Sequence, residues 1–176
     1  MHLDIIRARL KTPLNPTLKP NGWRPASVLL PIYGSCPHII MTVKSEQMRI
    51  HAGEASFPGG KPEYNDADLC HTALRETREE IGLHVGHQSI IGQLDAVRTL
   101  NSKFLILPFV AVLDSVPRLS PNVEVCRILQ MPLEPLLDTL EPDTGHGPNM
   151  FNLYYKDMII WGASARMLYQ IKQAMV

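Results

Sequence analysis

The sequence has few cysteines, no excess of charge and no long hydrophobic run, and each of these absences excludes a class of protein. Cys36, Cys70 and Cys126 lie far apart without a CxxC pair, which argues against a disulfide framework or a zinc site. Seventeen basic residues balance seventeen acidic ones, so the chain offers no electrostatic footprint for nucleic acid or an anionic membrane. No run of about 18 apolar residues or signal-peptide core occurs. We therefore expect a soluble cytoplasmic protein.

Length and hydrophobic content favour one domain over residues 1–176. A chain of 176 residues, 45% of them hydrophobic, can bury a single core without disulfides. Proline and glycine residues separate short apolar segments, and the sequence has neither a repeat nor a long linker. We expect one compact domain, and the sequence leaves open whether it forms a homodimer.

The apolar pattern predicts strands mixed with helices. Runs of branched apolar residues predict strands at 26–32, 37–44, within 87–100, at 103–114 and through 157–161. Helical patterns lie around 132–139 and over 163–175. The segment 57–65, FPGGKPEYN, is expected to have no regular structure. Elements of these lengths indicate a sheet with helices on both faces.

A helix over residues 66–82 is the most regular element that the sequence predicts. Asp66 is expected to cap its start and Gly82 to close its end. The residues expected on its apolar side are Leu69, Ala73, Leu74, Thr77 and Ile81. The other side carries Glu76, Glu79 and Glu80. Like charges at these spacings weaken an isolated helix by a few tenths of a kcal/mol per pair, roughly.

The three glutamates have two interpretations. An acidic stripe on a helix is usually a solvated face. Here, however, the helix follows a loop with Gly59 and Gly60, which can bring bare backbone close to a ligand. Clustered carboxylate oxygens are the donors that Mg²⁺ or Mn²⁺ prefers. The pattern therefore favours a site for a divalent cation.

The segment from Gly59 to Leu83 resembles the signature of the Nudix hydrolases. In that signature an acid precedes R-E-U-x-E-E-x-G-U, where U is aliphatic, and RETREEIGL matches it from Arg75 onwards. Thr77 departs from one aliphatic position. Eight residues separate Asp66 from Arg75, one more than the signature has between its first acid and its arginine. Glu63 and Asp66 therefore both remain candidates for the upstream acid. The resemblance implies an α/β/α sandwich with a mixed sheet.

The preceding segment resembles one branch of that family, the coenzyme A pyrophosphatases. Residues 40–60 read IMTVKSEQMRIHAGEASFPGG, in register with the branch pattern L-L-T-x-R-S-x-x-x-R followed by G and F-P-G-G. Lys44 stands where that pattern has arginine, which keeps the charge but loses the planar fork. The resemblance implies hydrolysis of coenzyme A or acyl-CoA to 3′,5′-ADP and 4′-phosphopantetheine.

The same resemblance implies roles for the acids. Glu76 and Glu80 are expected first as ligands of Mg²⁺ or Mn²⁺, with Glu79 next. Arg75 is expected to pair with an acid and to hold their geometry; its alternative is an ordinary surface ion pair. Glu124 lies where related enzymes bring an acid to the metals or the water, although it could also be a simple loop acid.

Substrate-binding residues are expected beside these acids. Arg49 and Lys44 are candidates for contacts to the substrate phosphates, because a chain without net charge must concentrate positive charge where it binds an anion. Gly59 and Gly60 are candidates for close backbone contact, and the Gly60 carbonyl for a further metal ligand. Trp161 is expected in the core.

Other functions remain as alternatives. The enzymatic one is hydrolysis of another nucleoside diphosphate derivative, such as an ADP-sugar or a dinucleotide. A non-catalytic binding module of Nudix type is disfavoured because the acids are intact. The sequence contains no G-x-S-x-G elbow, P-loop or Rossmann fingerprint, so acyl transfer and nucleotide-dependent phosphorylation have no support.

Overall fold

The computed structural model describes residues 1–45 and 53–176. Its helices are α1 (Leu3–Leu10), α2 (Leu69–Ile81), the 3₁₀ helix η1 (His87–Ser89), α3 (Leu133–Asp138) and α4 (Gly162–Met175). Its strands are β1 (Arg24–Tyr33), β2 (His38–Lys44), β3 (Ala55–Ser56), β4 (Gly59–Gly60), β5 (Ile90–Gln93), β6 (Val97–Arg98), β7 (Phe104–Leu113), β8 (Val125–Pro132), β9 (Glu141–Pro142), β10 (Phe151–Tyr155) and β11 (Met158–Ile160).

The main sheet is mixed. Within the described ranges its strands follow the order β3-β2-β1-β7-β5, with β4 paired to β1, β6 to β7 and β8 to β2. β1 and β7 run parallel over their whole length, from Arg24 beside Phe104 to Tyr33 beside Leu113, and the other pairs are antiparallel. Strands β9, β10 and β11 form a smaller antiparallel sheet. The mixed sheet is thus confirmed.

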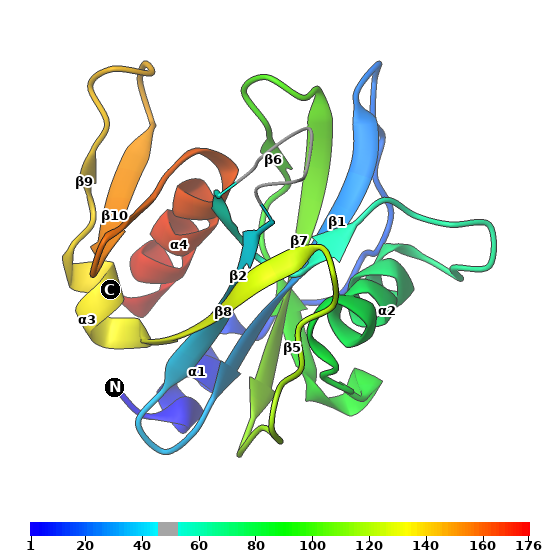
Figure 1. Ribbon diagram of the computed structural model, residues 1–176, viewed down its shortest axis with the longest axis horizontal. Helices are drawn as coiled ribbons and strands as arrows, with labels where there is room; N and C mark the ends of the chain where they lie inside the picture. Colours follow the sequence, from blue (N-terminus) through cyan, green and yellow to red (C-terminus); the bar gives the residue numbers. More distant parts are fainter. Residues whose placement is uncertain (46–52) are drawn as a thin grey trace.

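Helices cover both faces of the main sheet (Figure 1). Side chains alternate along β1, because successive residues of a strand point to opposite faces. Leu29 packs with Ala73 of α2 on one face. Leu30, its neighbour, belongs to the core that includes α1 and α4 on the other. The expected α/β/α sandwich is therefore the observed architecture, and α2, which carries the glutamates, has a face of the sheet largely to itself.

The predicted helix over 66–82 is α2, but its start differs from the expectation. The N-cap is Asp68, whose carboxylate accepts a hydrogen bond of 2.8 Å from the backbone N–H of His71. Asp66 was the wrong cap, since its carboxylate is engaged by Arg75. Gly82 closes the helix as expected, with a φ of 69° and its N–H donated to the Arg78 carbonyl.

The expectation that segment 57–65 has no regular structure was wrong in part. Gly59 and Gly60 form β4, which pairs with β1 opposite Val28 and Ser27. A Cβ added at Gly59 would overlap the backbone oxygen of Ser27, and the φ of Gly59 is 155°. The pairing therefore needs glycine at this position. The sequence patterns also failed to predict α1, η1, β3, β8, β9 and β10.

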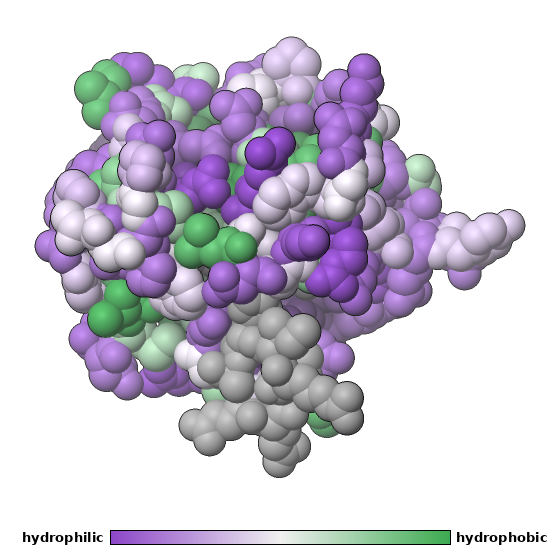
Figure 2. All heavy atoms as spheres, turned by 90° about the horizontal axis from the view of Figure 1, so that it is seen from above, coloured by the Kyte–Doolittle hydropathy of each residue, from purple (hydrophilic) through white to green (hydrophobic). Residues whose placement is uncertain are grey.

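The surface seen from above the view of Figure 1 is mostly hydrophilic, and small separate hydrophobic areas lie among the polar residues (Figure 2). Within the described ranges, no helix combines the length and the apolar character needed to cross a membrane.

Gly59→Ala is expected to lower the free energy of unfolding by about 2 kcal/mol or more, because the added methyl group meets fixed backbone and the backbone conformation is strained. Urea denaturation would measure the change. Gly145→Ala is the control, since its Cβ would meet nothing closer than 3.4 Å. Equal stability of the two variants would contradict the proposed constraint.

Candidate active site

Arg75 joins the acids of α2 to the segment that precedes the helix. Its guanidinium donates two hydrogen bonds of 3.0 Å to the carboxylate of Asp66. It also donates to Glu79 at 3.0 Å and lies 3.2 Å from Glu76. A further bond of 3.2 Å reaches the Lys61 carbonyl. Arg75 thus contacts three acids, and its expected role in holding their geometry stays a prediction.

Asp66, rather than Glu63, is the upstream acid that pairs closely with Arg75. The side chain of Asp66 is 2% exposed, whereas that of Glu63 is 67% exposed and lies 3.8 Å from the guanidinium. The hydrogen bonds from Arg75 hold the pKa of Asp66 well below its usual range. Those same bonds raise the pKa of Arg75.

Glu80 is buried, which does not fit the solvated acidic stripe that was one of the two interpretations of the three glutamates. Its side chain is 2% exposed and pairs with Lys44 of β2 through Oε1. Its Oε2 has no hydrogen-bond partner in the described structure. Burial raises the pKa of Glu80, while the Lys44 ammonium acts in the opposite direction. Glu80 is therefore a buried carboxylate with one oxygen that has no hydrogen-bond partner in the described structure.

Glu76 lies against the glycine strand β4. A Cβ added at Gly60 would overlap its carboxylate, so the absence of a side chain at Gly60 leaves the space that Glu76 fills. Burial raises the pKa of Glu76, and the nearby charge of Arg75 partly offsets that effect. Gly60 and Glu76, which are only near each other in the sequence, are thus in close approach in the structure.

Glu124 reaches the same region from a distant loop. The Ser45 N–H donates to its backbone carbonyl at 2.9 Å, and the Asn122 N–H donates to the Glu80 carbonyl at 2.9 Å. The side chain of Glu124 is exposed, yet its charge is near enough to contribute to the raised pKa of Glu80. These backbone contacts bring the loop of Glu124 to α2, and a role for its side chain at the metals or the water stays a prediction.

The donor set fits a hard divalent cation, although its present arrangement does not form a metal site. Within residues 1–45 and 53–176, no three Asp, Glu, His or Cys side chains are grouped so as to hold a metal ion. Glu76 and Glu79 contact Arg75, and Glu80 contacts Lys44. Carboxylate oxygens are nevertheless the ligands that Mg²⁺ and Mn²⁺ prefer, and Glu80 Oε2 is buried without a partner. To bind a metal ion, Glu76 and Glu79 would have to release Arg75, and Glu80 would have to release Lys44.

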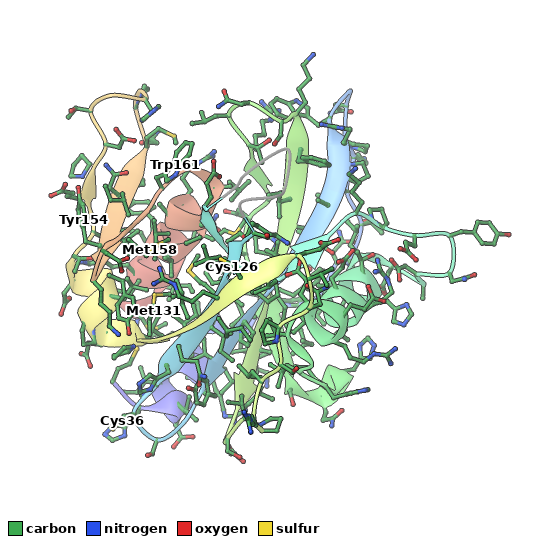
Figure 3. The ribbon with its side chains drawn as sticks, viewed as in Figure 1. Cys36, Cys126, Met131, Tyr154, Met158 and Trp161 are labelled. Atoms are coloured by element: carbon green, nitrogen blue, oxygen red, sulfur yellow. The ribbon has the colours of Figure 1, made fainter. Side chains whose placement is uncertain are left out.

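A cleft of about 280 Å³ adjoins the acids. Lys44, Gly59 and Gly60 line it, so their expected contact with substrate stays a prediction, and Lys44 also pairs with Glu80. Trp161 lines it too and is only partly buried, so the expectation that it belongs to the core was wrong. Its position just before α4 is labelled in Figure 3. The other expected phosphate contact, Arg49, lies outside the described residues.

Comparison with known sequences defines the class. A model of the NUDIX domain matches residues 23–146. The uncharacterised Nudix hydrolase NudL of Pectobacterium atrosepticum is 30% identical over 174 residues, covering 93% of this chain and 89% of that protein. NudL of Photorhabdus laumondii is 30% identical over 175 residues, covering 95% and 93%. The chain therefore belongs to the Nudix hydrolases, which cleave phosphorus anhydrides in nucleoside diphosphate derivatives and generally use divalent metal ions.

Solved structures agree on the fold. A MutT/nudix family protein from Enterococcus faecalis superposes with a TM-score of 0.64 at 12% identity, over 92% of this chain and 64% of that one. The NUDIX domain of Shewanella oneidensis NrtR, solved with ADP ribose, has a TM-score of 0.64 at 14% identity, over 88% and 89%. At such identities the likeness shows the Nudix fold alone.

Asp66→Asn is expected to lower the free energy of unfolding by about 2 kcal/mol near neutral pH, because it removes the charge from a buried acceptor of two Arg75 hydrogen bonds. The lowered pKa means that charged Asp66 stabilises the fold. This contribution is complete above the unfolded-state pKa of about 3.9 and is lost as the pH falls towards the folded-state value. The difference between wild type and variant should therefore shrink below about pH 4.

Urea denaturation across this pH range is the measurement, with Glu63→Gln as the exposed control. The control should cost less than about 0.5 kcal/mol, as is usual for exposed pairs. A loss from Glu63→Gln as large as that from Asp66→Asn would mean that the two acids have been assigned the wrong way round.

Proposed function

We propose that this Nudix hydrolase cleaves the diphosphate bond of coenzyme A or acyl-CoA, giving 3′,5′-ADP and 4′-phosphopantetheine or its acyl form. The observation that supports a diphosphate site most directly is that Glu76 and Glu80 of α2 meet Gly60 and Lys44, two residues that line the cleft. The choice of coenzyme A is supported by the pattern over residues 40–60, which resembles the coenzyme A pyrophosphatases.

Glu76 and Glu80 are the residues that would hold Mg²⁺ or Mn²⁺, with Glu79 as a further ligand. A bound divalent cation would neutralise the phosphoryl oxygens and lower the pKa of a water molecule. Glu124, exposed beside Glu80, is a candidate for holding or deprotonating that water. Arg75 is a positioning residue, because its contacts to the acids set their directions before substrate arrives.

Lys44 and Arg49 would bind phosphates of the substrate, beside the backbone of Gly59 and Gly60. Lys44 lines the cleft, so its ammonium needs only to turn from Glu80 towards the substrate. A lysine suits such an exchange because its ammonium is a point charge on a flexible stem, whereas arginine forms bidentate pairs. The proposed exchange also frees Glu80 for the metal.

Product analysis tests the substrate assignment. Purified protein with Mg²⁺ or Mn²⁺ is expected to convert coenzyme A into 3′,5′-ADP and 4′-phosphopantetheine, which mass spectrometry identifies. An ADP-sugar and a dinucleotide complete the panel, since they represent the alternative substrates. Turnover of these two but not of coenzyme A would leave a Nudix hydrolase of different specificity.

Glu80→Gln is expected to lower turnover at least about a hundredfold while the fold persists, because a neutral amide of the same shape removes charge from a hard-cation site. The rate is measured on whichever substrate of the panel the wild type hydrolyses. Glu63→Gln removes a neighbouring but exposed acid and should retain most of the activity. Normal turnover of Glu80→Gln would remove Glu80 from the proposed ligands.

Metal binding should raise the melting temperature, because an ion that binds only the folded state stabilises it by mass action. Millimolar Mg²⁺ or Mn²⁺ is expected to shift the wild type and Glu63→Gln upwards, and the double variant Glu76→Gln, Glu80→Gln much less. Differential scanning fluorimetry without substrate gives the comparison. The same shift in the double variant would place the metal elsewhere.

A further inference from the structure

The cleft beside the acids has a second wall, which the proposed chemistry does not use. This wall comes from the start of α4 and from β7, where Trp161, Met167, Phe104 and Ile106 line the space. At about 280 Å³ the cleft lies just below the range of roughly 300–1,000 Å³ in which pockets bury a drug-sized molecule. It can therefore hold only part of a molecule as long as coenzyme A.

Trp161 is held in this wall by two residues from the loop before β10. The carboxylate of Asp143, which is 7% exposed, lies 2.7 Å from Nδ1 of His146 and accepts a bond of 2.9 Å from the Gly145 N–H. The His146 ring stacks on the indole of Trp161, with centroids 5.7 Å apart and planes inclined by 29°. Asp143 and His146 thus restrict the indole from the side of this loop.

Away from Lys44 and the glycines, which the proposed function assigns to the diphosphate, the lining of the cleft favours an uncharged group. Most of its walls are apolar, and among the described lining residues the charged side chains are Lys44, Glu54 and Lys61. Lys44 pairs with Glu80, and the ammonium of Lys61 lies 5.5 Å from the centre of the Phe104 ring. A phosphate group would call for several charge-assisted donors. An apolar chain with a few amide groups would instead replace water at these walls.

One hydroxyl in the cleft lacks a hydrogen-bond partner. Ser27 is fully buried in β1, and its Oγ is unpaired in the described structure. A buried hydroxyl without a partner costs on the order of 1–3 kcal/mol, so a ligand that supplies an acceptor would recover part of that cost. An amide carbonyl is such an acceptor.

The aromatic rings of the cleft are poorly placed to stack on a nucleobase, and one of them, Phe57, is only 2% exposed. One face of Trp161 is covered by His146. The Phe104 ring has the Arg24 guanidinium 4.2 Å from its centre, in addition to Lys61. Stacking between two rings needs open faces, whereas an aliphatic chain can pack against edges and remaining faces. The cleft therefore suits the chain better than the adenine.

We propose that this cleft binds the pantetheine half of the substrate, an uncharged amide chain ending in a thiol or a thioester, and that Trp161 contacts it. Asp143 and His146 act as positioning residues for the indole. The assignment rests on the proposed function, since it takes coenzyme A as the substrate. It leaves the charged adenosine half on the far side of the diphosphate, outside this cleft.

The binding test needs neither metal nor turnover. The chain has two tryptophans, so Trp23→Phe leaves Trp161 as the sole indole reporter. Trp23 is outside the cleft, beneath the Arg98 guanidinium at 5.2 Å. Pantetheine and an acyl-pantetheine are expected to change the Trp161 emission saturably, and 3′,5′-ADP is expected not to. The proposal would be overturned if only 3′,5′-ADP changed the Trp161 emission saturably, or if none of the three compounds did. Calorimetry on the wild type repeats the titrations if the variant fails to fold.

Kinetics separate the proposed subsite from the proposed function. Trp161→Ala should raise the Michaelis constant for coenzyme A about tenfold with little change in kcat, as expected for loss of one large apolar contact. Trp23→Phe, the matched control, should leave it unchanged. An unchanged Michaelis constant in Trp161→Ala would reject the proposed pantetheine subsite but not the proposed hydrolysis of coenzyme A. Absence of coenzyme A turnover in the wild type would reject the proposed substrate, while the titrations would still report on the cleft.

The positioning role has a spectroscopic readout of its own. In the Trp23→Phe background, His146→Leu and Asp143→Asn should both shift the emission of Trp161 and weaken the response to pantetheine. His84→Leu, on a histidine outside the cleft, is the control and should change neither. Unshifted emission in both loop variants would show that the loop does not position the indole.

Discussion

The concentration of carboxylates on and beside α2 is the constraint on which the rest of the site depends. Carboxylates removed from water cost several kcal/mol each, roughly, unless cations or hydrogen-bond donors compensate them. Arg75 compensates Asp66 and the two more exposed glutamates of the helix, and Lys44 compensates Glu80. Because Lys44 comes from β2 and Asp66 from the loop before α2, the same contacts that balance charge also fix the helix against the sheet and the loop.

These ion pairs do not contribute equally. The pair between Arg75 and Asp66 is buried and bidentate, so it has the geometry that makes such a pair strong. Glu79 is 48% exposed, and its contact with Arg75 is of the kind that contributes only about 0.3–0.5 kcal/mol. The buried pair of Lys44 and Glu80 roughly balances its own desolvation, so it specifies an arrangement more than it adds net stability. A pair of that kind can exchange partners at small net cost.

Features that depend on local periodicity were predicted from the sequence. Features that depend on contacts between segments far apart in the chain were not. The apolar side of α2 and its closure at Gly82 follow from residues within the helix, and both were predicted. Glu80 is buried against Lys44, 36 positions earlier, and the helical period, which only grouped Glu80 with Glu76 and Glu79, could not predict that contact. The strand at 59–60 exists only because β1 lies beside it. Trp161 follows an apolar run that is typical of core, and only the loop of His146 shows why it faces a cleft.

One short segment connects the two parts of the cleft. The hydroxyl of Ser164, in the first turn of α4, donates a bond of 3.2 Å to the carbonyl of Ala55 in β3. At Gly60, five residues after Ala55, the carboxylate of Glu76 fills the space that a side chain would need. The backbone between these two points is held by β2 on one side and by β1 on the other. These contacts connect the start of α4, through residues 55–60, to the acids of α2. Residues 55–60, which include FPGG, therefore carry two constraints at once: close backbone approach at the acids, and a connection to the wall that we propose binds pantetheine.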